Sequence, residues 1–158
     1  MTTEFPAAVR RVEAALTAAG LEPRVLEFPA STRTAVEAAV AVGTTVGQIV
    51  KSLLFLSAGR PVLALVSGSN RLDLERLAVL AGLPVTKADA NAVREATGYS
   101  IGGVPPLGFP QPVPCFVDRD LLTYPIVWAA AGTPHHVFEI TPADLVRVTA
   151  ATVADLKA

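Results

Sequence analysis

A stretch rich in glycine and proline, residues 98–114 (GYSIGGVPPLGFPQPVP), is the most informative segment of the chain for chemistry. Within it, Gly102 and Gly103 would let a ligand approach the backbone, and Pro105 and Pro106 would fix the shape of the loop. Such a loop suits the presentation of backbone N–H groups to an oxyanion or a carbonyl oxygen. The same composition is typical of a tight surface crossover without a ligand. The residues alone leave both interpretations open.

Lys51 is the second residue whose position suggests chemistry. It begins an apolar strand and is flanked by Ile49, Val50, Leu53 and Leu54. An isolated ammonium buried there would be costly, so Lys51 must reach solvent or find a partner. One hypothesis is a contact with a phosphate or a carbonyl at the edge of a pocket. The other is a lysine at a strand end that extends to solvent, and the residue pattern alone favours this second hypothesis.

The remaining reactive side chains do not form a recognisable catalytic set. His135 and His136 are the only histidines, and consecutive strand residues point to opposite faces, which argues against shared metal ligation. Asp118 and Asp120 could share one face of a strand, although their position favours a turn. Cys115 lies in an apolar strand, as a small core residue would. We therefore expect no metal, no cofactor and no side-chain nucleophile.

The elements that must position these residues are indicated by apolar periodicity and by glycine and proline stops. Helices are predicted over 5–19, 34–42, 72–80, 88–97 and 141–148, with a short helical turn over 44–50. Strands are predicted over 23–28, 51–57, 61–67, 115–117, 125–129 and 136–140. Residues 58–60 (AGR) predict a hairpin between two strands that are apolar on both faces and therefore central. Helices mixed with strands and a tight hairpin indicate the α+β class.

Length and composition limit the class of protein further. The chain has 158 residues, of which 51% are hydrophobic and 17% charged, and its formal net charge is -1. This predicts one domain, residues 1–158, with a full hydrophobic core. The charge balance argues against a protein that coats nucleic acid and against a sequence-specific DNA-binding protein. The charged amino-terminal run and the short apolar runs predict a soluble, cytoplasmic protein without a signal peptide or a membrane span.

Four segments, in this order, carry a resemblance to a known family. They are residues 46–53 (VGQIVKSL), 72–74 (LDL), 97–108 (TGYSIGGVPPLG), and 117–118 followed by a strand and Gly132. With them the chain resembles the YbaK / prolyl-tRNA-synthetase-associated domain family of freestanding aminoacyl-tRNA deacylases. The likeness covers roughly residues 20–156. The third segment is long and specific, whereas the others alone would be weak.

The resemblance implies a single compact α+β domain with a mixed, barrel-like β-sheet flanked by helices. It also implies hydrolysis, in trans to the synthetase, of the ester between a small or thiol-bearing amino acid and the 3′ adenosine of a mischarged tRNA. The Cys-tRNA(Pro) type or a related one is expected. A synthetase pocket separates side chains that differ by one methylene by only about 1–3 kcal/mol, so a second site must remove the errors. The expected partners are the acceptor end of aminoacyl-tRNA and prolyl-tRNA synthetase.

The same resemblance assigns roles to residues. Lys51 and Gly102 are the expected catalytic residues: Lys51 holds the tRNA end or polarises the ester, and the loop N–H groups position the carbonyl. The expected substrate-binding residues are Phe28, Tyr99, Gly103, Val104, Pro105, Pro106, Asp118, Ala130 and Gly132. Tyr99 either packs the loop or lines its pocket, and the expected role of Asp118 is to hold the loop rather than to react.

The chain departs from the family pattern in one region. Where cysteinyl-tRNA editors carry a serine before paired glycines, this chain has Ala130-Ala131-Gly132. Relatives that edit alanyl-tRNA place a histidine in this region, and here His135 and His136 fall slightly later, so a catalytic role for either stretches the match. The alternative function is a non-catalytic module that binds a tRNA acceptor end or a synthetase. The combination of Lys51 with the loop favours the enzyme.

Overall fold

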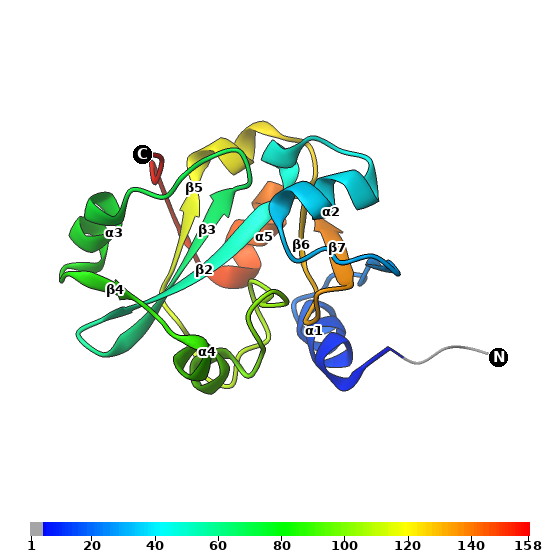
Figure 1. Cartoon of the computed structure of the whole chain (residues 1–158), viewed down its shortest axis with the longest axis horizontal. Coiled ribbons are helices and arrows are strands. Elements are labelled where there is room, and N and C mark those ends of the chain that lie inside the picture. Colours follow the sequence, from blue (N-terminus) through cyan, green and yellow to red (C-terminus); the bar gives the residue numbers. More distant parts are fainter. Residues whose placement is uncertain (1–4) are drawn as a thin grey trace.

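The structure, a computed structural model, describes residues 5–158 and contains helices packed on two β-sheets (Figure 1). The helices are α1 (Ala7–Ala18), α2 (Ala35–Val42), α3 (Leu74–Ala81), α4 (Ala90–Thr97) and α5 (Pro142–Thr149), with 3₁₀ helices η1 (Val46–Gln48) and η2 (Arg119–Thr123). The strands are β1 (Val25–Glu27), β2 (Val50–Ser57), β3 (Arg60–Ser67), β4 (Val85–Lys87), β5 (Cys115–Asp118), β6 (Val127–Ala130), β7 (His136–Ile140) and β8 (Thr152–Ala154). Every predicted helix and strand is present. Strands β4 and β8 were not predicted, whereas the turn expected at Asp118 and Asp120 is present as η2.

The larger sheet has the strand order β4-β2-β3-β5-β8, with β3 at its centre and β2 beside it. Strands β2 and β3 form an antiparallel hairpin, whereas β5 pairs parallel with both β3 and β8. Ala58 and Gly59 connect the hairpin with φ angles of 52° and 78°. Two positive φ angles are what a two-residue hairpin turn of type I′ requires. The predicted hairpin and the central position of its strands are confirmed.

The smaller sheet has the order β1-β7-β6 and is antiparallel throughout. One parallel bridge, between Ile49 and Trp128, connects it to the larger sheet. The α+β class and the mixed pairing are confirmed. The sheets do not close into a barrel within residues 5–158: Ile49, just before β2, is bridged to β6, and β2 pairs with β4 only at its other end, from Phe55 to Ser57.

The main core fills the space between the two sheets and includes Leu63, Leu65, Val117, Leu121 and Phe138, all at most 1% exposed. A second core cluster lies on the other face of the larger sheet, under α3. The strand β3 is therefore buried on both faces, which fixes its neighbour β2 in place. The longest helix, α1, has 12 residues, and no helix in the described part of the chain is long and apolar enough to cross a membrane.

Candidate active site

A cavity of about 470 Å³ opens along one edge of β2. At one end of this edge Ile49 is bridged to Trp128 of β6, and at the other end Phe55 is paired with Lys87 of β4. Between these points no strand of the described chain covers the edge. The Leu54 carbonyl faces this edge, because it accepts a hydrogen bond from the Ala88 N–H at 3.4 Å. Main-chain groups two residues apart point to the same edge, so the N–H and C=O of Ser52 face the cavity edge too.

The cavity walls are largely apolar and come from five parts of the chain. They are the segment from Thr32 into α2, strand β2, the start of α4 with the residues before it, the loop at 101–104, and the strands β6 and β7. Three cationic side chains also line the cavity: Arg33, Lys51 and Lys87. No acidic residue is among the lining residues. The cavity is therefore an apolar space with positive charge and without compensating carboxylates in its walls.

Lys51 is half-buried, and its ammonium donates a hydrogen bond to the Asn70 backbone carbonyl at 2.5 Å. Burial lowers the pKa of Lys51 below its ordinary value. The Asp118 carboxylate opposes this shift and raises the pKa, whereas the Arg71 guanidinium lowers it further. Lys51 therefore does not simply extend to solvent, as the residue pattern alone favoured. Its cation is held at the cavity by one carbonyl, with a desolvation cost.

The Asn70 carbonyl is held in place by two aspartates. The Asn70 side-chain amide donates to Asp118 Oδ2 and to Asp120 Oδ2, both at 2.8 Å. Asp118 is completely buried and also accepts from the backbone N–H groups of Ser67 at 3.1 Å and of Asp120 at 3.0 Å. A buried carboxylate needs such donors to offset its desolvation. Asp118 therefore fixes the loop at residues 67–70, which carries the acceptor of Lys51, and its hydrogen bonds do not reach the glycine–proline loop. It does not line the cavity itself.

The glycine–proline loop contributes main-chain N–H groups to the cavity. Gly102 and Val104 line the cavity, and neither N–H has a hydrogen-bond partner among residues 5–158. The N–H between them, of Gly103, donates to the Ser100 carbonyl at 3.1 Å. Gly102 has a φ of 94°, a conformation that favours glycine. A Cβ at Gly103 would lie 2.7 Å from the Thr133 backbone, so this glycine lets the loop pack closely on the β6–β7 connection.

Four of the expected site residues line the cavity: Lys51, Gly102, Val104 and Ala130. The other seven lie behind its walls or away from them. Tyr99 is buried; its hydroxyl donates to the Gly108 carbonyl at 3.1 Å, and the Arg11 guanidinium lies 4.7 Å from its ring centre. Tyr99 therefore packs the loop.

Gly103, Pro105 and Pro106 are buried in the loop, and Gly132, with a φ of 104°, packs against the backbone of α1. Phe28 is half-buried, and its N–H donates to the His135 carbonyl. These positions support the cavity walls, and a direct contact of these residues with a ligand stays a prediction.

The side chains set aside in the sequence analysis do not line the cavity. His136 is buried beside Glu27 and Thr133, whereas His135 is exposed. Cys115 is buried, and burial raises the pKa of its thiol to about 12, so it is a core residue and a poor nucleophile. In the part of the chain that the structure describes, no group of three or more histidine, cysteine or carboxylate side chains could hold a metal ion.

Sequence reasoning missed Arg33, Lys87 and Trp128 in the cavity walls, and Asn70 as the partner of Lys51. Arg33 and Lys87 are isolated cations in short connecting segments, where nothing in the residue pattern marks them. Asn70 lies between the predicted strand 61–67 and the predicted helix 72–80, where nothing in the residue pattern marks it. These residues come together because the edge of β2 is bridged to β6 at one end and paired with β4 at the other.

These features define a small α+β domain with an apolar cavity that offers a cation and unpaired main-chain N–H groups to a ligand, and no serine–histidine or cysteine–histidine pair lines it within residues 5–158. The model of one family, the aminoacyl-tRNA editing domain, matches residues 29–148. The chain belongs to the aminoacyl-tRNA editing domain family.

Two proteins and one solved structure are similar to this chain over most of its length. The "Uncharacterized protein YwhH" of Bacillus subtilis (strain 168) is 32% identical over 125 residues, which cover 78% of this chain and 80% of that protein. The "Putative Cys-tRNA(Pro)/Cys-tRNA(Cys) deacylase EbsC" of Enterococcus faecalis (strain ATCC 700802 / V583) is 27% identical over 120 residues, covering 75% of this chain and 73% of that protein. A solved structure described as "a putative trans-editing enzyme for prolyl tRNA synthetase" has 52% identity and a TM-score of 0.94, with 98% of this chain and 99% of that chain covered.

Proposed function

We propose that this protein hydrolyses the ester of mischarged aminoacyl-tRNA in trans to the synthetase. The net reaction consumes one water: the bond between the carbonyl carbon and the ribose oxygen breaks, the water oxygen joins the carbonyl carbon, and a proton passes to the ribose oxygen. The products are the free amino acid and an uncharged tRNA. The names of EbsC and of the solved trans-editing relative support this reaction class.

One observation carries the proposal: the cavity combines the Lys51 ammonium with the unpaired N–H groups of Gly102 and Val104. In ester hydrolysis, negative charge develops on the carbonyl oxygen in the transition state. Main-chain N–H groups and a cation that belong to lining residues and are already in place would stabilise that charge without reorganisation. We assign Lys51 to holding the tRNA end or polarising the ester, and the two N–H groups to the carbonyl oxygen.

The cavity walls favour a small amino acid side chain that carries no positive charge. Ala35, Ala38, Ile49, Ala129 and Ala130 present only apolar surface. Among residues 5–158, no carboxylate lines the cavity to accept a basic side chain. Cysteine and alanine fit this chemistry, and we propose Cys-tRNA(Pro) or a related ester as the substrate. Such a substrate is met in the cytoplasm.

Single-turnover deacylation of cysteinyl-, alanyl-, seryl- and threonyl-tRNA tests the proposed function. We expect one or two of these esters to be hydrolysed well above their spontaneous rate by the wild-type protein. Hydrolysis of none of them, with intact binding of the tRNA acceptor end, would replace the enzyme with the non-catalytic binding module. Association with prolyl-tRNA synthetase is a separate part of the proposal, and sedimentation of the two proteins without a complex would remove it.

Gly102→Ala tests the loop. The φ of 94° strains any residue with a Cβ, and the new Cβ would lie 2.7 Å from Arg33 Nε. We expect the variant to lose about 1–2 kcal/mol of stability from the backbone conformation, and about 10- to 100-fold in single-turnover rate because the N–H groups shift.

Gly82→Ala is the matched control for this loop variant. Its φ is 86°, and nothing lies within 4 Å of the position that its Cβ would take. It should lose similar stability, measured by thermal unfolding, and keep its rate. Equal rates for both variants would show that the loop is only a crossover.

A further inference from the structure

The positive charge around the cavity is local and unpaired. Arg33, Lys51 and Lys87 line the cavity, and none of them forms an ion pair with any carboxylate of residues 5–158. The chain as a whole has a net charge of -1. Elsewhere several arginines are neutralised by ion pairs, as Arg147 is by Asp144. The cavity is thus a place where an otherwise balanced protein presents positive charge to a ligand.

Arg33 is exposed, but its backbone is held on both sides. The Thr32 N–H and hydroxyl both donate to the Pro134 carbonyl, at 2.6 Å and 2.9 Å. On the other side Thr34 caps α2 and exchanges hydrogen bonds with Glu37. The Arg33 side chain lies against the loop, because a Cβ at Gly102 would meet its Nε at 2.7 Å. The backbone of Arg33 is therefore fixed. Its guanidinium, which pairs with no carboxylate of residues 5–158, lies beside the proposed carbonyl site.

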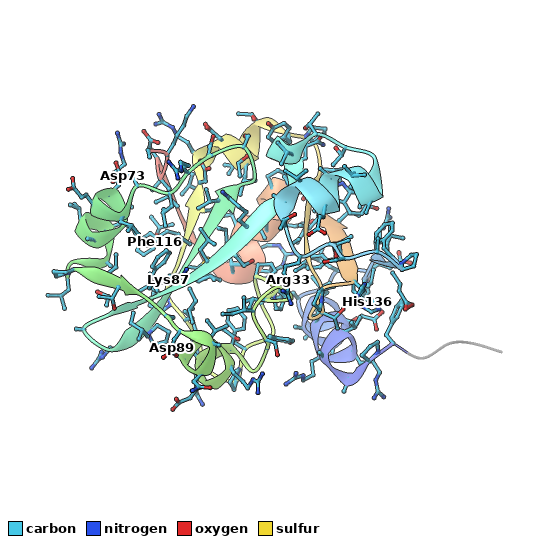
Figure 2. All side chains as sticks on the ribbon, in the orientation of Figure 1. Arg33, Asp73, Lys87, Asp89, Phe116 and His136 are labelled. Atoms are coloured by element: carbon cyan, nitrogen blue, oxygen red, sulfur yellow. The ribbon has the colours of Figure 1, made fainter. Side chains whose placement is uncertain are left out.

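Lys87 lies at a different part of the cavity. It is the last residue of β4, is exposed, and pairs with Phe55 across the strands. Figure 2 shows Arg33 and Lys87 well apart from each other. The nearest carboxylate in sequence, of Asp89, is already used as the N-cap of α4, where it accepts from the Ala92 N–H at 2.8 Å. The Lys87 ammonium therefore has no hydrogen-bond or ion-pair partner among residues 5–158.

We propose that Arg33 and Lys87 each bind a backbone phosphate of the single-stranded 3′ end of the RNA, while the terminal ester is bound at Lys51. This inference rests on the proposed function. An arginine guanidinium matches a phosphate with two parallel hydrogen bonds, and a lysine binds it as a point charge. Because both side chains are exposed whereas Lys51 is half-buried, they meet the charged chain outside the cavity. Lys51 is left to the ester inside it.

Two substrates test the proposal, one with the RNA chain and its phosphates and one without them. One is the aminoacyl-tRNA that the wild type hydrolyses, and the other is the same amino acid esterified to adenosine, which has no phosphate. Arg33→Ala and Lys87→Ala are compared with wild type, and Arg60→Ala is the control. Arg60 is an exposed cation at the β2–β3 turn that does not line the cavity.

In either variant, we expect the preference in kcat/KM for aminoacyl-tRNA over the adenosine ester to fall about three- to tenfold. In addition, the log–log slope of RNA affinity against salt should become less steep by about 0.7, the value for one phosphate on a single strand. The affinity is measured between 50 and 200 mM salt with a labelled RNA that ends in CCA and carries no amino acid. Arg60→Ala should match wild type in both measurements.

The results that would overturn the proposal are distinct from failure of the function. An unchanged salt slope in both variants, or equal losses on the two esters, would show that these cations do not bind phosphate. Absence of hydrolysis of every ester by wild type would remove the proposed function. The RNA-binding measurement would still decide whether Arg33 and Lys87 contact phosphates.

Discussion

Lys51→Ala is expected to lower the single-turnover rate of deacylation by about 10²- to 10³-fold, the cost of removing one group that stabilises a developing oxyanion. Its thermal stability should change by less than about 1 kcal/mol. The ammonium makes one hydrogen bond, to the Asn70 carbonyl, and its lowered pKa shows that burial already disfavours the charge. Removing the ammonium therefore relieves the cost of desolvating its charge and loses one hydrogen bond.

Lys51→Met separates charge from packing in this experiment. Methionine keeps an unbranched apolar stem of similar length and loses the cation, so it should be as slow as the alanine variant. A rate near that of wild type in Lys51→Met would show that the stem rather than the charge is needed. A large fall in melting temperature for both variants, measured by calorimetry, would assign Lys51 to the fold.

Asp118→Asn is expected to cost about 3 kcal/mol in the free energy of unfolding, or roughly 6–12 °C in melting temperature. The fully buried carboxylate accepts from the Ser67 and Asp120 N–H groups and from the Asn70 amide. An asparagine would turn one oxygen into a donor, and at least one buried donor would then face another. The Asn70 carbonyl that holds Lys51 would lose its anchor.

The pH profile of Asp118→Asn shows whether Asp118 positions Lys51 or only stabilises the fold. The Asp118 carboxylate raises the pKa of Lys51, so its loss should lower that pKa further. If the reaction needs the protonated amine, activity falls as the pH rises through this pKa, and the alkaline fall should move to lower pH in the variant. This is measured well below the melting temperature of the variant.

Asp120→Asn is the matched control for the aspartate. Asp120 is half-buried and accepts one side-chain hydrogen bond, from the Asn70 amide. An asparagine keeps one acceptor oxygen, so we expect a loss below about 1 kcal/mol and a smaller shift of the pH profile. Equal effects of the two substitutions would show that Asp118 has no special part in holding Lys51.

Local signals in the sequence predicted most of the elements correctly. Helix α2 begins after the capping residue Thr34 and ends at the left-handed Gly43. Ala58 and Gly59 form the turn of the hairpin. The missed strands β4 and β8 are the two edge strands of the larger sheet and have three residues each. Strand β8 forms because it pairs with β5, far away in the chain, and no local pattern carries that information.

The site was predictable in part. The loop signal pointed to Gly102, whereas the importance of Lys51 came from the family resemblance, since its flanking residues alone favoured a solvent-exposed lysine. The contact between Lys51 and Asn70 joins residues on either side of the β2–β3 hairpin, and the pairing of Val50 with Ser67 creates it. Arg33 reaches the cavity only because Thr32 is tied to Pro134. Such placements depend on tertiary contacts that residue spacing does not contain.

The open edge of β2 and the N–H groups of Gly102 and Val104 are main-chain features, and this has an evolutionary consequence. A substitution can delete a side chain, but it leaves N–H and C=O groups in place for as long as the fold persists, proline excepted. The apolar wall residues can then diverge between lineages, and with them the preferred amino acid, while the polar frame is inherited unchanged. Selectivity in such a domain is free to drift without a new reaction having to evolve.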